Sequence, residues 1–402
     1  MASNLKTIHS TWMPGQFRWA AFGRTAVIGF ALVLSPGMVW GQGPKLATGK
    51  GTPDATLSPA DRGRKLLNEA FAKSQVAKTV DDASEILEQC ERAESLSLNA
   101  ANFTYAQKLK AWAHNRRGEI YAEQASQLVK EGEVREANDL DAVALEDFSA
   151  ALKLDETKWV AYHNRGFHLA LFGRHEEALA DYTKAIELQE KFTKAWLDRG
   201  SLRWSLGQEE AALADFSQAI KLAPQDGDAW LRRAQANLAL GKFPAALADI
   251  NQTLRVQPNH ALAYALRGEA SLGMGSWQNA ASDFGQAIRL NPKLVRGYRG
   301  AAWILATCPE ASVRNADTAL AYAKKAIELS PKKEAKLYDI LAAAQANAGQ
   351  FDEARETLTQ ALEMASREQV DELTLRLANY LDLKPFRLSP PAESARANVT
   401  AR

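Results

Sequence analysis

The sequence predicts an all-α protein, a solenoid of about eight helix-turn-helix repeats that ends in a capping helix. Three observations support this prediction. Similar residues recur at an interval of 34 positions through the middle of the chain. Within each interval, residues four and seven positions apart form one apolar face, which is the spacing of a buried helical stripe. Alternating runs rich in Val, Ile and Thr, which would indicate strands, are nearly absent.

The repeat is clearest in four consecutive blocks between residues 159 and 294. Each block has an aromatic residue, a Gly or Ala four positions later, a turn Gly, an Ala in the second helix and, in most blocks, a closing Pro. These columns are Tyr162, Trp196, Trp230 and Tyr264; Gly166, Gly200, Ala234 and Gly268; Gly173, Gly207, Gly241 and Gly275; Ala178, Ala212, Ala246 and Ala280; and Pro224, Pro258 and Pro292. Small residues let paired helices approach closely, the turn Gly ends a first helix, and Pro stops a second helix.

The blocks resemble the tetratricopeptide repeat, as in "AWLDRGSLRWSLGQEEAALADFSQAIKLAP". The resemblance covers about residues 62–383. It implies a right-handed solenoid of helical hairpins that takes part in interaction and assembly, without naming a partner. The segments "AAWILATCPEASVRNADTALAYAKKAIEL" and "LYDILAAAQANAGQFDEA", followed by "KPFR", are similar to a C-terminal arrangement in bacterial, often exported, proteins of this family.

Residues 1–41 predict a secretory signal peptide. Lys6, Arg18 and Arg24 precede the apolar run "TAVIGFALVL", and cleavage is expected after Gly41. The run is too short to span a bilayer, which needs about 20 apolar residues. The mature chain is therefore expected to be periplasmic or secreted, without a membrane span. The alternative is an uncleaved N-terminal membrane anchor, extended backwards through "WAAFG".

The solenoid is expected to occupy residues 61–383, after a disordered linker at 42–60 that is rich in Gly, Pro, Thr and Lys. Its first helix begins near Ser58, where Ser-Pro-x-Asp supplies a capping hydroxyl, a Pro for the first turn and an acidic residue. We expect the extra residues of the first stretched repeat to lengthen its helices or the loop between them. In the second stretched repeat, "TCPEASVRN" is expected to widen the turn. The further expected parts are regular repeats at 159–294, stretched repeats near 107–155 and 295–333, a last repeat at 335–366, a capping helix at 367–383 and a disordered tail at 384–402.

A charge pattern recurs as regularly as the small residues. An Arg on each first helix precedes an Asp on the second helix by sixteen residues, or by thirty across the first stretched repeat. Because the Arg column adjoins the close-packed Gly column, we expect partly buried Arg–carboxylate pairs that fix the helix register. The alternative is a row of charges displayed to a charged ligand. The pairs are Arg117 with Asp147, Arg165 with Asp181, Arg199 with Asp215, Arg233 with Asp249, and Arg267 with Asp283.

The partner-binding surface is expected on the concave side of the solenoid, which the first helices line in proteins of this family. The stripe next to the buried columns is unusually apolar, and Trp and Arg are frequent among residues that dominate binding energy. The alternative is that these side chains pack against the next helix. The candidates are His163, Phe167, Leu171, Leu197, Ser201, Trp204, Leu231, Gln235, Leu238, Glu269, Leu272, Arg299 and Trp303.

Composition and motifs argue against several other functions. The chain has 49 basic and 48 acidic residues, a net charge of +1 and no basic stripe, so nucleic acid is not an expected partner. The six His residues lack zinc-protease spacing, and "GPKLATGKG" lacks the glycine spacing and the Ser or Thr of a phosphate loop. No catalytic residue, metal or cofactor is predicted. Cys90 and Cys308 lie in distant repeats, beyond the reach of a disulfide.

The sequence therefore predicts a non-catalytic scaffold that binds a peptide or a partner helix along the groove. Two alternatives stay open. One is a structural subunit of a cell-envelope assembly that docks by its convex side or its ends, and the other is an accessory protein of an envelope enzyme.

Overall fold

The computed structural model of this protein describes residues 57–389, which form seventeen helices and no strand. The helices pair in chain order as eight hairpins, and a single helix follows them. This confirms the predicted all-α repeat architecture for the part of the chain that the structure describes. The predicted signal peptide, most of the linker and residues 390–402 of the predicted tail lie outside it. No helix within 57–389 is both long enough and apolar enough to cross a membrane.

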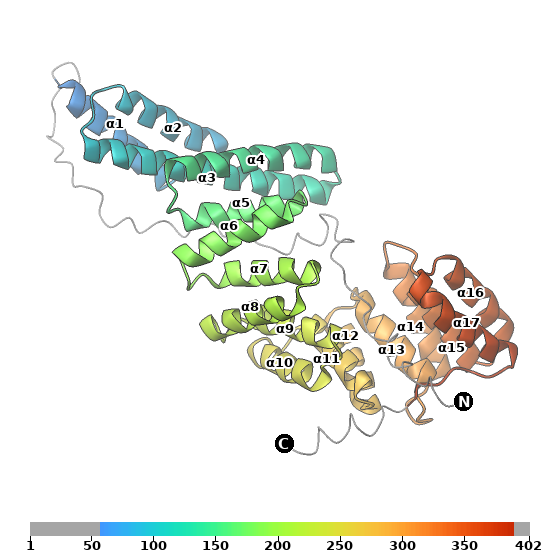
Figure 1. Cartoon of the computed structure of the whole chain (residues 1–402). Coiled ribbons are helices and arrows are strands. Elements are labelled where there is room, and N and C mark those ends of the chain that lie inside the picture. The colour runs from blue at the N-terminus through green and yellow to red at the C-terminus, as the bar shows by residue number, and fades with distance from the viewer. Residues whose placement is uncertain (1–56, 390–402) are drawn as a thin grey trace, which may run out of the picture. The chain divides into compact units, whose positions relative to one another are not determined.

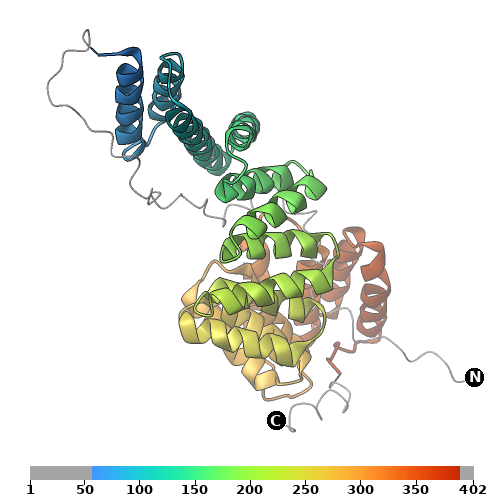
Figure 2. The same ribbon diagram turned by 60° about the vertical axis from the view of Figure 1, so that its left-hand side comes forward.

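The described chain divides into two compact units, and the division falls between Asp215 and Phe216 in α8 (Glu209–Leu222). In the N-terminal unit the hairpins follow one another in chain order (Figures 1 and 2). Its complete helices are α1 (Pro59–Ser74), α2 (Val80–Glu94), α3 (Ala100–Glu131), α4 (Val134–Leu154), α5 (Trp159–Leu171), α6 (His175–Leu188) and α7 (Thr193–Ser205). Those of the C-terminal unit are α9 (Gly227–Ala239), α10 (Phe243–Val256), α11 (Ala261–Gly273), α12 (Trp277–Leu290), α13 (Val295–Thr307), α14 (Ala316–Leu329), α15 (Ala335–Asn347), α16 (Phe351–Glu363) and α17 (Arg367–Leu381).

The regular hairpins close through a glycine in the left-handed conformation. Gly173 has a φ of 75°, which a residue without a Cβ adopts at little cost. Its N–H donates to Ala170 O, and the N–H of Arg174 donates to Leu169 O at 2.8 Å. The last carbonyls of a first helix are thus satisfied by its own turn.

The two stretched repeats differ in how they use their extra residues. In the first, the surplus lengthens the helices, because α3 has 32 residues and α4 has 21, and they are separated by only Gly132 and Glu133. In the second, the helices keep ordinary lengths and the surplus forms the connection of residues 308–315. α13 ends at Thr307, and the residue that follows it is Cys308, with a φ of −54° and a ψ of 134°, and not a left-handed glycine.

Small residues set the distance between helices, as their columns suggested. Ala178 and Ala246 are completely buried in the second helices. At Gly166 an added Cβ would lie 3.2 Å from Ala178 O and equally close to the side chains of Asp181 and Tyr182. The first helix can approach the second this closely only without a side chain at this position.

The aromatic column is less enclosed than a buried stripe requires. Tyr162, Trp196, Trp230 and Tyr264 are all half-buried. The indole N–H of Trp230 donates to Pro224 O at 2.9 Å, and that of Trp196 donates to Glu190 O at the same distance. The aromatic residues thus bind the loop that precedes their helix, which keeps them at the edge of the core.

Candidate protein-binding surface

The regularly spaced Arg and Asp residues form five bidentate pairs within hairpins. In each pair the Nε and Nη2 atoms of Arg donate to the two carboxylate oxygens of Asp over 2.7–3.0 Å. All five Asp residues are buried. Two parallel bonds to a buried carboxylate fix one helix against the other. The pairs are Arg117–Asp147, Arg165–Asp181, Arg199–Asp215, Arg233–Asp249 and Arg267–Asp283.

Four of these Arg residues also reach the preceding hairpin. Their Nη1 atoms donate over 3.0–3.3 Å to a polar side chain on its second helix. These contacts are Arg117 to Ser84, Arg199 to Thr183, Arg233 to Ser217 and Arg267 to Asn251. In addition, the guanidinium carbons of Arg165, Arg199, Arg233 and Arg267 lie 4.8–5.7 Å from the centroid of the aromatic ring three residues earlier. One side chain therefore joins its own hairpin, its neighbour and the aromatic column.

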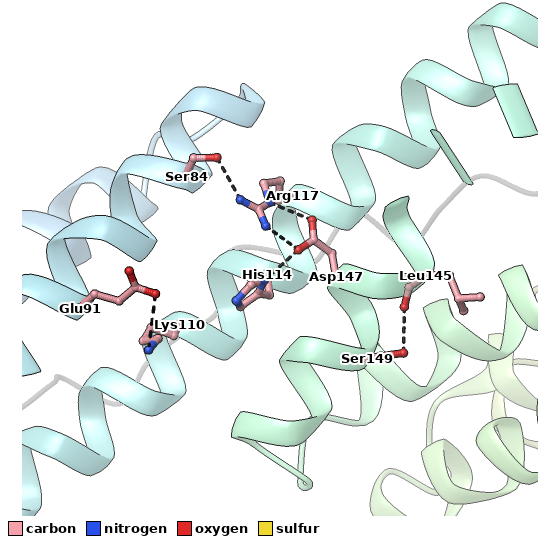
Figure 3. Close-up of polar contacts among 8 residues, drawn as sticks. All are labelled: Ser84, Glu91, Lys110, His114, Arg117, Leu145, Asp147 and Ser149. Atoms are coloured by element: carbon pink, nitrogen blue, oxygen red, sulfur yellow. Dashed lines mark hydrogen bonds and ion pairs between the residues drawn. The ribbon is translucent and has the colours of Figure 1, made fainter. Parts of the chain in front are cut away.

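The first pair has an additional partner, as Figure 3 shows. His114 Nδ1 lies 2.8 Å from Asp147 Oδ1, on the same carboxylate that Arg117 binds. Burial alone would raise the pKa of Asp147, but the hydrogen bonds from Arg117 and His114 outweigh it and lower the pKa. Asp147 is thus held ionised between α3 and α4.

The candidate stripe on the first helices is more enclosed than the sequence suggested. Eight of its thirteen residues are buried, five are half-buried and none is exposed. The eight buried residues agree with the alternative that these side chains pack against the next helix, because neighbouring first helices such as α13 and α15 contact each other. The half-buried residues are Phe167, Leu171, Trp204, Gln235 and Arg299. The buried ones are His163, Leu197, Ser201, Leu231, Leu238, Glu269, Leu272 and Trp303. We call the part of this stripe within each unit the first-helix surface of that unit.

In the N-terminal unit, a chain of buried polar residues connects three first helices. On α3, Asn115 Nδ2 donates to Glu119 Oε1 at 2.8 Å, and Asn164 Nδ2 of α5 reaches the same oxygen at 3.4 Å. Next to Asn164, His163 Nε2 lies 2.9 Å from Asp198 Oδ2 of α7. His163, a candidate for partner binding, therefore joins α5 to α7 inside the unit.

In the C-terminal unit, two further candidates pair with each other across neighbouring first helices. Glu269 of α11 accepts from Arg296 Nε at 2.7 Å and from Arg299 Nη2 at 3.3 Å. Burial acts to raise the pKa of Glu269, but the two guanidinium groups outweigh it and lower the pKa. The carboxylate is therefore ionised and links α11 to α13.

Trp303 of α13 is covered by the end of the chain. We call residues 382–389 the C-terminal segment. Its Phe386 ring lies 5.8 Å from the Trp303 ring, and Trp303 is only 1% exposed. Arg387 and Leu388 hydrogen-bond to the end of α13. Residues 386–388 therefore lie against α13 and α15, which differs from the prediction of a disordered tail over this stretch.

Comparison with known families accounts for the regular hairpins. One tetratricopeptide repeat model matches residues 197–249 and 231–294, and a second matches 160–192 and 335–367. These ranges coincide with successive two-helix hairpins of the structure. The chain therefore contains tetratricopeptide repeats over these ranges. The stretched repeats and the first hairpin lie outside the matched ranges.

Several solved structures of tetratricopeptide repeat proteins are similar to this chain, whereas no curated protein matches its sequence. A repeat protein from Parabacteroides merdae is 21% identical with a TM-score of 0.47, and the match covers 66% of this chain and 98% of that one. A thermophilic repeat protein from Thermus thermophilus is 26% identical with a TM-score of 0.39, over 47% and 98% of the two chains. Yeast Tom70 is 17% identical with a TM-score of 0.42, over 88% and 70%.

Several residues at the first-helix surface of this repeat protein were not expected from the sequence. They are Asn347, Arg376, Phe386 and Arg387, which lie on α15, α17 and the C-terminal segment. The only sequence signal was "KPFR", a short apolar and basic motif within a polar tail. Among the described residues, no group of three or more His, Cys, Asp or Glu side chains could hold a metal ion.

Proposed function

We propose that this protein is a non-catalytic scaffold that binds a segment of a partner protein on its first-helix surface. Tetratricopeptide repeats form protein-interaction scaffolds, and the proposal adds the surface and the form of the ligand. One observation carries it: a non-helical segment of the chain lies against α13 and α15. It is held there through one backbone hydrogen bond, two side-chain hydrogen bonds and an aromatic contact.

The buried ion pairs support this role because they make the surface rigid before a partner arrives. The five Arg–Asp pairs fix the five successive hairpins from α3–α4 to α11–α12, and the His163–Asp198 contact fixes α5 against α7. A surface that is already ordered loses little conformational entropy on binding. The half-buried side chains of Phe167 and Trp204 remain accessible in part for contact with a ligand.

The test begins with peptides selected by phage display against the full-length protein. We expect Phe167→Ala and Trp204→Ala to weaken binding of peptides seated on the N-terminal unit by at least about tenfold, the range for interface residues that dominate binding. Fluorescence anisotropy of labelled peptides measures the affinities.

Leu188→Ala is the matched control, because Leu188 is an exposed apolar residue on a second helix, α6. It should leave every affinity unchanged. The proposal fails if no selected peptide loses affinity with any of the first-helix variants.

A second candidate function is a structural subunit that docks by its terminal helix. It is favoured by Leu375, Leu381 and Leu383, which are 54%, 61% and 62% exposed on and just after α17. Large apolar side chains exposed at the end of an array in this way suit contacts between proteins. Leu375→Glu and Leu381→Glu would abolish partner binding under this alternative and leave it intact under the first-helix proposal.

We also propose that the protein is exported. The proposal rests on the charged and apolar pattern of residues 1–41. Mass spectrometry of the protein from its native cells should find a mature N-terminus at Gln42. Recovery of the uncleaved chain in the membrane fraction would instead indicate the anchored form.

A further inference from the structure

The end of α13 differs from the ends of the regular first helices. In α9, the N–H groups of Leu240, Gly241 and Lys242 donate to the last carbonyls of the helix, so its own turn satisfies them. In α13, Cys308 N donates to Ile304 O and Asn315 N donates to Leu305 O. The widened turn then leads away from the helix axis. The carbonyls of Ala306 and Thr307 accept from elsewhere.

The C-terminal segment supplies the donors that this turn lacks. Leu388 N donates to Thr307 O at 2.9 Å, and Arg387 Nη1 donates to Ala306 O at 2.9 Å. Arg387 Nη2 donates to Asn347 Oδ1, at the last residue of α15, also at 2.9 Å. The guanidinium group therefore lies at the C-terminal ends of two first helices, where the helix dipoles favour a positive charge.

The residue before Arg387 is recognised by an aromatic ring and a cation. Phe386 packs against Trp303, and the guanidinium carbon of Arg376 lies 4.9 Å from the Phe386 ring and 5.0 Å from the Trp303 ring. Arg376 is held in place by Asp339 and Glu372. These contacts define a receptor for an aromatic side chain beside a receptor for a guanidinium group.

We infer that the ends of α13 and α15, together with Trp303 and Arg376, form a binding site for a partner segment that carries an aromatic residue followed by Arg. The C-terminal segment occupies this site in cis, so a partner segment of the same chemistry binds only when the C-terminal segment leaves. The inference rests on the proposed function, and it adds the chemistry of the ligand and the competition for its site.

Competition follows from the short connection between the C-terminal segment and α17. α17 ends at Leu381, and Phe386 follows within a few residues. A short flexible tether gives an effective concentration in the millimolar range. A free peptide at micromolar concentration therefore competes poorly until the contacts of the C-terminal segment are weakened.

The experiment uses a fluorescent peptide with the sequence of residues 381–389 and the full-length protein. Arg387→Ala and Phe386→Ala should bind this peptide at least about tenfold more tightly than the wild type does, because the site is then vacated in cis. Lys384→Ala is the matched control. Lys384 is exposed in the same segment, its side chain contacts only Asp382 among the hydrogen bonds of the described chain, and its loss should change nothing.

Two further arms identify the site. Adding Asn347→Ala to Arg387→Ala should weaken binding of the peptide again, and a peptide with Ala in place of the Arg should not bind. Equal affinity of the wild type and the Arg387→Ala and Phe386→Ala variants, or no binding by any of them, would overturn the inference. Circular dichroism melts establish that each variant is folded.

A measurement on the unmodified protein makes the test independent of variants. An excess of isotope-labelled peptide should speed amide hydrogen exchange in residues 384–389 of the wild type, and unchanged exchange would contradict the inference. If selected peptides still bind the N-terminal unit in that case, the proposed function stands and only the competition fails. If no peptide binds either unit, both fail.

Discussion

Lys158, immediately before α5, is a cation enclosed by the N-terminal unit. It is 6% exposed, and burial lowers its pKa from 10.5 to about 8 although Asp155 and Glu119 act to raise it. Desolvation is therefore larger than the attraction of the two carboxylates. Its ammonium group cannot form the bidentate hydrogen bonds of an Arg, and its side chain makes no capping hydrogen bond to α5. It costs stability at neutral pH, in contrast to the paired Arg residues on the same helices.

The two pKa values of Lys158 determine whether the free energy of unfolding rises or falls with pH. Between pH 8 and 10.5 the unfolded chain keeps a proton on Lys158 that the folded chain has lost, so stability rises with pH. Lys158→Met should remove this rise and stabilise the protein at pH 7 by at most about 3 kcal/mol, at about 1.4 kcal/mol per pKa unit. Urea unfolding at several pH values measures the effect. Lys191→Met, at an exposed position, is the control, and an unaltered slope in Lys158→Met would contradict the assignment.

At the scale of elements, contact between successive helices depends on where a Cβ is absent. Gly300 of α13 faces Phe284 of α12, and a Cβ added to it would lie 2.2 Å from the Phe284 ring. Gly285 follows Phe284 on α12. A Cβ added to Gly285 would have only the Arg289 side chain within 4 Å, at 3.8 Å. Two glycines in neighbouring helices therefore have opposite roles, one required by packing and one tolerated.

Alanine substitution separates these roles. Gly300→Ala should destabilise the protein by about 1–3 kcal/mol, because the Phe284 ring must leave its rotamer or push α13 away. Gly285→Ala should be neutral or stabilise it by about 0.5–1 kcal/mol, the usual gain from replacing Gly inside a helix. Chemical denaturation of the two variants in parallel tests the packing. Equal effects would mean that α12 and α13 are not packed as described.

Across the molecule, each hairpin of a repeat array contacts mainly its neighbours, so a defect should stay local. Arg233 connects α9 to α10 through Asp249 and to α8 through Ser217. Arg233→Ala leaves Asp249, which is 4% exposed, without its bidentate partner. Because the Arg233 side chain is itself 25% exposed, we expect a loss of about 2–4 kcal/mol, below the full cost of breaking an enclosed pair.

Hydrogen exchange followed by mass spectrometry shows where this loss falls. Protection should decrease in α9 and α10 and remain unchanged in α15, α16 and α17. Arg255→Ala, at an exposed position of α10, provides the comparison and should alter little. A uniform decrease across the C-terminal unit would instead indicate that the unit unfolds as one cooperative block.

How far the sequence predicts this molecule depends on whether a feature recurs. The hairpins and the spacing of Arg165 and Asp181 occur in several copies, and a recurring pattern identifies which residues meet. The enclosure of Trp303 has no such copy, because its cover comes from Phe386, far along the chain. His163 likewise contacts Asp198 and the rings of Tyr182 and Phe192, a combination that its period of 34 residues does not reveal. Unique long-range contacts of this kind leave no period in a sequence.

The widened turn after α13 links two distant parts of the chain in a way that bears on how such a protein can change. Ala306 and Arg387 are 81 residues apart, yet the side chain of Arg387 donates a hydrogen bond to the carbonyl of Ala306. A deletion that restored a glycine turn would satisfy the helix end locally and release the C-terminal segment. Loss of Arg387 would in turn leave the carbonyl of Ala306 without the donor that the long turn does not supply. We therefore expect the turn and the segment to vary together among related sequences.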